Sequence, residues 1–298
     1  MTETGSNGDE RVVDALDPAE AFELLAHETR FAILEALNDA DGPVAFSELR
    51  AAVGADDPGG FNYHLRKLTG RFVRDGDDGY EIAGPGRQVV GAVLSGVYTY
   101  RLDADPVSMP AACLGCGGDM ETRFDETAVR MVCLSCDTTF HPIAIPPGVL
   151  EGWPRERTPD AIDRWVRHIR QTAELGLCYT CGGRTRRRVD PLDEDAPAHL
   201  LRLDLAAVVE NWCGRCGAHW REFPAAGVLA KPSVIAFHHE HGLDVQKTPF
   251  WELDWLETGV SSIAAADPLR VEVPIEIEDE TLVVTTDDEL SVVATRRI

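Results

Sequence analysis

The chain has very few lysines and no long apolar segment. Only three of its 28 basic residues are lysine, against 51 aspartates and glutamates, and the net charge is −23. No apolar run approaches the roughly 18 residues that a membrane span requires. The opening residues, MTETGSNGDERV, contain neither the basic nor the apolar region of a secretory signal. We therefore expect a cytoplasmic protein without a membrane segment, with residues 1–14 as a disordered tail.

This acidic balance bears on which partners the chain can bind. Carboxylates in excess, with arginine in place of lysine, favour adaptation to a cytoplasm rich in potassium chloride; the alternative is an acidic partner-binding surface. In molar salt the Debye length is about 3 Å, so the overall charge hardly repels DNA. Local charge then decides, and the stretch 58–74 contains four basic residues and no acidic one.

Hydrophobic spacing and turn residues predict a winged helix-turn-helix at 15–100. Asp17 begins the first of four helices, the second covers about 29–38, Ser47 caps the third and Pro58 begins the fourth. Two short strands around a Gly/Asp turn follow the fourth helix. Short helix, turn, basic helix and hairpin, in that order, place the basic helix in the major groove of DNA.

One face of the fourth helix carries the residues that we expect to contact double-stranded DNA. Phe61, Leu65 and Leu68 recur at helical spacing and form the buried face. The polar residues between them face outward, and two further arginines lie near the wing. The expected DNA contacts are Asn62, Tyr63, Arg66, Lys67, Arg71 and Arg74.

Three stretches of this domain resemble the ArsR-like winged-helix regulators. HETRFAIL at 27–34 is similar to the second-helix signature of that family, and NYHLRKL at 62–68 to its recognition helix. The residues at 80–87 look like its junction between the last strand and the last helix. The resemblance covers about 15–100 and implies a homodimer through a helix at about 85–100. The apolar residues of that helix are Val89, Val90, Val93, Leu94 and Val97.

The domain also departs from the family in two places. The fourth helix opens with Pro-Gly-Gly at 58–60, where relatives more often carry Ser, Gln or Thr, so base contacts cannot be transferred there. No cysteine precedes Cys113, so the metal-sensing cysteines of some members have no counterpart. Metal sensing is therefore not expected in this domain.

All eight cysteines fall in four C-x-x-C pairs, and the pairs form an internal duplication. Sixteen residues separate the two pairs of the first unit, which is about right for a two-stranded hairpin, and 31 separate those of the second, which contains an acidic insert. Four thiolates can hold a tetrahedral Zn²⁺ at about 2.3 Å. The closed shell predicts two structural zinc ions per chain; a thiol redox switch is the alternative. The expected ligands are Cys113, Cys116, Cys133, Cys136, Cys178, Cys181, Cys213 and Cys216.

A helix is expected after each zinc-ribbon-like unit, at 160–174 and 231–241, which gives domains at 101–176 and 177–246. Two clusters in these domains allow two interpretations each. The arginines at 184–188 either contact phosphate or pair with the acidic insert at 190–196. The histidines at 238–241 either bind a metal or lie at an ordinary helix end.

The β-rich segment 247–298 completes the chain. Residues 250–256 alternate apolar or aromatic with acidic side chains, and strands are expected at 269–277, 281–286 and 290–295. We interpret these strands as a small antiparallel sheet that forms a ligand- or partner-binding cap. No nucleophile–base pair, phosphate loop or His/carboxylate cluster indicates an enzyme.

These features predict an α+β protein with a winged helix-turn-helix, two four-cysteine units each followed by a helix, and a C-terminal sheet. The function expected is sequence-specific transcription regulation, with a sensory or protein-binding C-terminal half. A transcription-machinery adaptor, similar to the large subunit of general transcription factor E, remains an alternative. A zinc hydrolase would need an open metal position, which four cysteines leave no room for.

Overall fold

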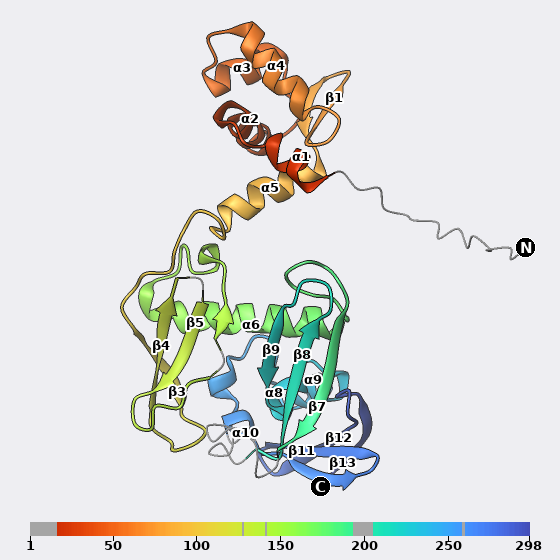
Figure 1. Ribbon diagram of the computed structural model, residues 1–298. Coiled ribbons are helices and arrows are strands. Elements are labelled where there is room, and N and C mark those ends of the chain that lie inside the picture. Colours follow the sequence, from red (N-terminus) through yellow and green to blue (C-terminus); the bar gives the residue numbers. More distant parts are fainter. Residues whose placement is uncertain (1–16, 127, 141, 193–204, 258–259) are drawn as a thin grey trace, which may run out of the picture. The chain divides into compact units, whose positions relative to one another are not determined.

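The computed structural model describes residues 17–126, 128–140, 142–192, 205–257 and 260–298; the tail expected at 1–14 lies outside them. The chain divides into two compact units, residues 1–98 and 99–298. Helices and four small antiparallel sheets make up the described parts (Figure 1). None of the helices found there is both long and apolar enough to cross a membrane.

Unit 1 packs short helices and one hairpin around a single core, which includes Ile33, Leu49 and Phe61. Asp17 caps the first helix and Pro58 begins the fourth, as expected. Asp57 caps the fourth helix, and each of the two carboxylates accepts two backbone N–H groups. The elements are α1 (Pro18–Glu23), α2 (Glu28–Asn38), α3 (Phe46–Val53), α4 (Pro58–Leu68), β1 (Val73–Gly76), β2 (Gly79–Ile82) and α5 (Gly84–Leu94).

Three expectations for unit 1 were wrong in detail. Helix α3 begins before Ser47, and its N-cap is Ala45, whose N–H donates to the carboxylate of Glu48. Helix α5 ends at Leu94, because the chain turns at Gly96 with a φ of 78°. Val90 is 2% exposed within the core of the unit, so it is not available to a second chain.

Unit 2 begins with the first cysteine module. Its sheet has the order β3-β4-β5-β6, with β4 and β5 forming the hairpin that the spacing of the cysteines predicts. Two short 3-10 turns then lead into a long helix. The elements are β3 (Val107–Ala112), β4 (Asp119–Asp125), β5 (Ala128–Cys133), β6 (Ile143–Ala144), η1 (Pro147–Val149), η2 (Arg155–Arg157) and α6 (Thr158–Glu174).

The second cysteine module repeats this order. Its sheet has the order β7-β8-β9, and a helical turn and a helix follow it, as they follow the first sheet. Helices are therefore present at both expected positions. The elements are β7 (Thr185–Pro191), β8 (Ala207–Cys213), β9 (His219–Glu222), α8 (Pro224–Gly227) and α9 (Pro232–Glu240).

The C-terminal segment contains all three expected strands in an antiparallel sheet of order β10-β11-β12-β13. Strand β10 was missed in the sequence because its alanines have low strand propensity. The alternating residues at 250–256 form helical turns instead. The elements are η3 (Phe250–Glu252), α10 (Asp254–Glu257), β10 (Ser262–Ala266), β11 (Leu269–Ile277), β12 (Glu280–Thr286) and β13 (Val292–Arg297).

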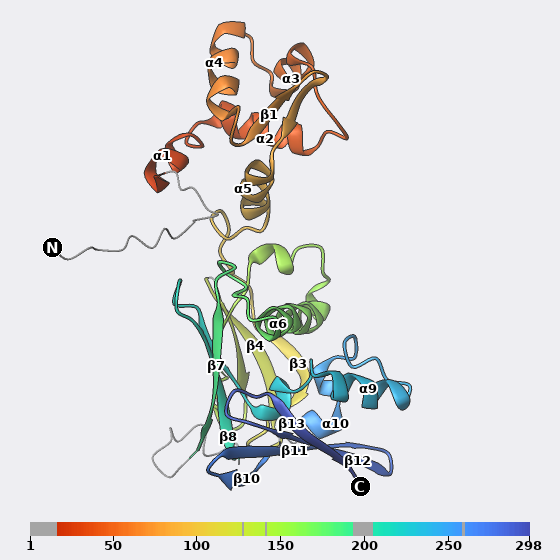
Figure 2. The ribbon, with the colours of Figure 1, turned by 90° about the vertical axis from the view of Figure 1, so that its right-hand side faces the viewer.

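The largest core of unit 2 joins the second module to the C-terminal sheet. Val209 of β8, Phe237 of α9 and Ile275 of β11 belong to one continuous cluster. The boundary expected at 246–247 therefore crosses a core. In Figures 1 and 2, α6, α8 and α9 lie on one side of the β7–β9 sheet, and no described helix or strand covers the other.

Candidate metal centres and nucleic-acid interface

Each C-x-x-C pair forms the same turn. The residue after the second cysteine donates its backbone N–H to the carbonyl oxygen of the first, over 2.7 to 3.2 Å. That residue has a left-handed backbone conformation in all four turns, which glycine adopts without strain and aspartate tolerates. The four residues are Gly117, Asp137, Gly182 and Gly217, with φ of 70°, 56°, 65° and 76°. The turns point both sulfurs of a pair to the same side.

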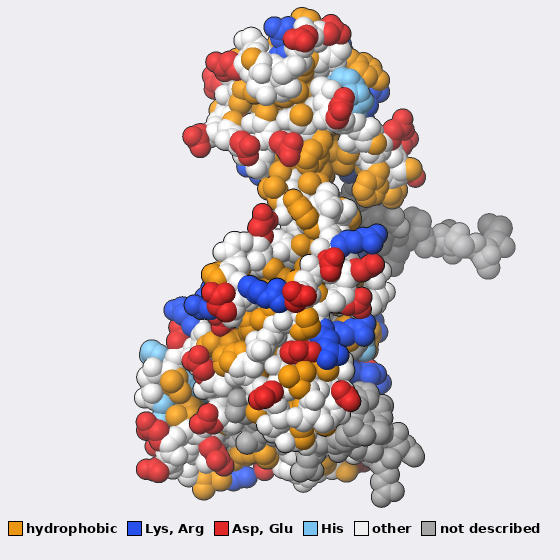
Figure 3. Space-filling view, turned by 90° about the vertical axis from the view of Figure 1, so that its left-hand side faces the viewer, with side chains coloured by type: hydrophobic (Ala, Val, Ile, Leu, Met, Phe, Trp, Pro, Cys, Tyr) orange, Lys and Arg blue, Asp and Glu red, His pale blue; other side chains and the backbone are white. Residues whose placement is uncertain are grey.

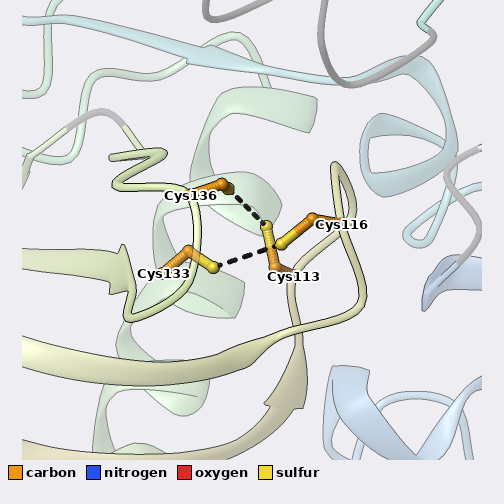
Figure 4. Close-up of side chains that lie close together, drawn as sticks. All are labelled: Cys113, Cys116, Cys133 and Cys136. Carbon is orange, nitrogen blue, oxygen red and sulfur yellow. Dashed lines mark hydrogen bonds between the residues drawn. The ribbon is translucent and has the colours of Figure 1, made fainter.

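The structure brings the eight expected ligands together in two groups of four. Within each group all Sγ atoms lie within 4.8 Å of one another. Figure 4 shows the first group, where Cys113 Sγ lies 3.8 Å from Cys136 Sγ, and Cys116 Sγ lies 3.5 Å from Cys133 Sγ. In the second group the closest pairs are 3.6 and 3.7 Å apart.

These distances fit a metal better than a disulfide. A disulfide places its sulfurs about 2.05 Å apart. Four ligands at about 2.3 Å from a common centre in tetrahedral geometry lie about 3.8 Å from each other. Both groups therefore have the spacing of a four-sulfur metal site, and each can hold one metal ion.

Hydrogen bonds make the thiols of each group differ in pKa. The hydroxyl and the backbone N–H of Thr138 lower the pKa of Cys136 to about 6. In the second group the backbone N–H groups of Cys216 and Arg215 lower the pKa of Cys213 to about 6. Within each group one thiol thus loses its proton more readily than its neighbours, and a metal ion displaces the remaining protons when it binds.

The exposed face of α4 carries the expected DNA contacts. Phe61, Leu65 and Leu68 are buried, as the helical spacing predicts. Tyr63 is 55% exposed and its ring lies 5.7 Å from Lys67 Nζ. A shallow hollow on this face is lined by Gly59, Asn62, Tyr63, Arg66 and Lys67.

The other two expected contacts are Arg71, just before the hairpin, and Arg74, within it. Arg71 is exposed. Arg74 on β1 forms an ion pair of 3.4 Å with Glu81 on β2. The exposed turn between the strands carries Asp75, Asp77 and Asp78, whose charges repel phosphate. Of these two arginines, Arg71 is therefore the better placed for the expected phosphate contact.

A cluster that sequence reasoning missed fixes the position of α4. Arg30 on α2 donates to the carbonyl oxygens of Glu23 and Leu24 at the end of α1, and its Nε donates to His64 Nδ1 on α4. The His64 ring lies 3.9 Å from that of His27. Burial, then the neighbouring His27 and Arg30, lower the pKa of His64. The signal was available, since all three residues belong to the family-like stretches.

The arginines at 184–188 split between the two faces of β7. Arg187 points inward, where it donates to Asn211 and to Glu174 of α6. Arg188 pairs with Asp190 at 2.6 Å, which confirms part of the expected pairing. The rest of the insert, at 193–196, lies outside the described residues. Arg184 and Arg186 are exposed on the outer face.

His238 is a core residue and not a metal ligand. The side chain is fully buried, Nδ1 lies 2.7 Å from the carbonyl oxygen of Val234, and Nε2 accepts a hydrogen bond from Trp255. Both ring nitrogens are therefore occupied in the neutral tautomer with the proton on Nδ1. Neighbouring His239 is exposed.

Comparison with known proteins identifies two domain families along the chain. Residues 110–292 match a family described as domain of unknown function DUF7351. Residues 18–93 match domain of unknown function DUF7347. The first match spans more than half of the chain and includes both cysteine groups. No curated protein and no solved structure matches the chain.

Proposed function

We propose that this chain, which belongs to the DUF7351 family, is a transcriptional regulator that binds double-stranded DNA through α4 of unit 1. One observation carries the proposal. The exposed face of α4 presents Tyr63, Arg66 and Lys67 without an acidic residue, in a chain whose net charge is −23. A basic surface without acidic residues is what contact with phosphate requires.

The order of elements in unit 1 supports a winged helix-turn-helix. Helices α2, α3 and α4 share one core with the β1–β2 hairpin, and Arg30 and His64 tie α4 to α2. A helix held in this way presents its free face to the major groove. Because Gly59 and Gly60 have no side chains, base contacts in this proposal come from Asn62, Tyr63 and Arg66.

Two zinc ions complete the proposal for unit 2. The sulfur-only donor sets and their spacing fit Zn²⁺, and four thiolates leave no coordination position for a reacting water. The zinc ions would hold the cysteine turns together and take no part in a reaction. Unit 2 then serves as a rigid sensory or partner-binding half.

A homodimer through α5 agrees with the surface of unit 1. Leu94, Val97 and Tyr98 are 60%, 48% and 74% exposed, and Phe22 on α1 is 69% exposed. Three of these side chains lie at or just beyond the end of α5, and exposed apolar side chains of this size are typical of a surface that a second chain covers.

Genome-wide immunoprecipitation of the tagged chain from its own host tests the function. The Tyr63→Ala/Arg66→Ala variant removes contacts of α4, and Arg87→Ala on the exposed side of α5 is the matched control. We expect a few sharp sites that share a palindromic motif, lost in the α4 variant and kept in the control. Broad occupancy of most active promoters would favour the adaptor, and no enrichment would reject the DNA-binding proposal.

A further inference from the structure

The outer face of the β7–β9 sheet concentrates basic charge. Strand alternation places Arg184, Arg186 and Arg188 of β7 and its preceding residue on this face, about 6.6 Å apart. Arg221 of β9 lies on the same face, because Glu210 of β8 is the cross-strand partner of both Arg188 and Arg221. We call these four arginines, with Trp212, the arginine face.

Only part of this charge is neutralised by described residues. Arg188 pairs with Asp190, and Arg221 pairs with Glu210 at 2.7 Å. Arg184 and Arg186 have no ion pair with another described residue. Among the described residues, four arginines therefore meet two carboxylates on this face, in a strongly acidic chain.

The first cysteine module shows that this charge is not a general property of the fold. With the C-x-x-C pairs of the two modules in register, Asp119 and Glu121 occupy the positions of Arg184 and Arg186. The exposed arginines of the first sheet are paired: Arg123 with Glu121 and Arg130 with Asp125, both at 2.6 Å. Figure 3 shows basic side chains of unit 2 lying beside acidic ones on that side.

A tryptophan lies within the arginine face. Trp212 of β8 is the cross-strand neighbour of Arg186 on one side and of His219 on the other, and it is partly exposed. No described helix or strand covers this side of the sheet in Figures 1 and 2. Basic residues around an aromatic ring on an open sheet are the arrangement with which proteins bind single-stranded nucleic acid.

We propose that the arginine face binds single-stranded DNA, with arginines on the phosphates and Trp212 against a base. The site is separate from α4 and does not depend on duplex binding there. A duplex has its bases stacked inside and gives Trp212 no base face to contact. DNA is taken as the strand because unit 1 is proposed to bind DNA, and the comparison with oligouridine tests this choice.

The test measures binding of a fluorescein-labelled oligothymidine to the full chain by anisotropy over a series of potassium chloride concentrations. All proteins carry Tyr63→Ala/Arg66→Ala, so that contacts of α4 do not contribute. Each phosphate contact on a single strand contributes about 0.7 to the slope of log K against log salt. We expect Arg184→Gln/Arg186→Gln to lower this slope by about 1.4, and Trp212→Ala to weaken binding about tenfold.

Matched variants separate a site from general charge. Arg123→Gln/Arg130→Gln removes the same charge from the first sheet and should leave the slope unchanged, while Trp212→Phe should retain binding. Zinc content and circular dichroism establish that each variant is folded. Equal slopes for the two arginine pairs would overturn the proposal. Tighter binding of a duplex, or of oligouridine, would overturn its assignment to single-stranded DNA.

Discussion

The two cysteine modules have the same turns and sulfur spacing but differ in what surrounds them. Val209 and Val189 of the second module belong to a core that continues through α9 into the C-terminal sheet. The first module packs on two smaller clusters, one around Met109 and Met120 and one around Val129 and Ile162. The same metal site is thus supported by very different amounts of buried apolar surface, which implies that the first module depends more on its metal.

The largest effect should come from removing one ligand in each module. Cys113→Ser and Cys178→Ser should each lower bound zinc from two ions to one per chain, since three thiolates no longer close the shell. Structural zinc contributes on the order of 10 kcal/mol to small domains. We expect amide exchange in Cys113→Ser to lose protection throughout β3–β5, while Cys178→Ser keeps protection in β11 and β12. The measurements are metal analysis and hydrogen exchange.

An unchanged zinc content in either variant would reject the ligand assignment. Equal loss of protection in the two modules would reject the difference in their dependence on metal. Cys136 and Cys213 serve as second variants, because they occupy the other turn of each group.

A buried ion pair joins the helix of the first module to the sheet of the second. Arg170 on α6 donates to Glu222 on β9 at 2.7 Å, and Glu222 also accepts from Asn211. Arg170→Met should destabilise unit 2 by about 3 kcal/mol, because it leaves the charge of Glu222 buried and unpaired. Denaturant unfolding checks this, with Arg164→Met on the exposed side of α6 as the control.

The second substitution Glu222→Gln should restore part of the loss in the Arg170→Met background, since it removes the unpaired charge. If the double variant is no more stable than Arg170→Met, the pair does not couple the two modules through its charge.

Features that depend on local sequence patterns were predicted better than features that depend on contacts between distant segments. Asp17 as a helix cap, the start of the fourth helix at Pro58, the hairpin after α4 and the four cysteine turns all depend on residues within a few positions. The continuous core between Val209 and Ile275 depends on segments far apart in the chain, so the boundary at 247 could not be corrected from periodicity. The division of the arginines between the two faces of β7 was also not predicted, because Arg187 and Arg188 were treated as one cluster.

His238 is buried on α9, the helix that follows the second module. Helix α6, which follows the first module, instead carries the ion pair of Arg167 and Asp163. Burial lowers the pKa of His238 below its ordinary value of about 6.5. The unfolded chain therefore binds a proton that the folded chain excludes. Stability from this group is complete above pH 6.5 and falls by about 1.4 kcal/mol per pH unit below it.

Denaturant unfolding of the wild type and His238→Gln between pH 7.5 and pH 5.5 isolates this contribution, on the order of 1 kcal/mol. The variant should show a shallower decline toward acid, and His239→Gln, on the exposed side of the same helix, should follow the wild type. Parallel curves for wild type and His238→Gln would show that the residue takes up its proton without unfolding α9.

The smallest effect concerns the one cysteine turn that lacks glycine at its left-handed position. Asp137 has a φ of 56° where the other three turns have Gly117, Gly182 and Gly217. The left-handed conformation costs a residue with a side chain about 1 kcal/mol. Glycine avoids this cost, but its greater freedom in the unfolded chain offsets part of the gain in stability. Asp137→Gly should therefore stabilise the first module by about 0.5 kcal/mol, and Gly217→Asp should destabilise the second by a similar amount. Thermal unfolding of both variants with zinc bound measures the difference, and a loss of stability in Asp137→Gly would mean that the aspartate side chain stabilises this turn in a way that the other three do not need.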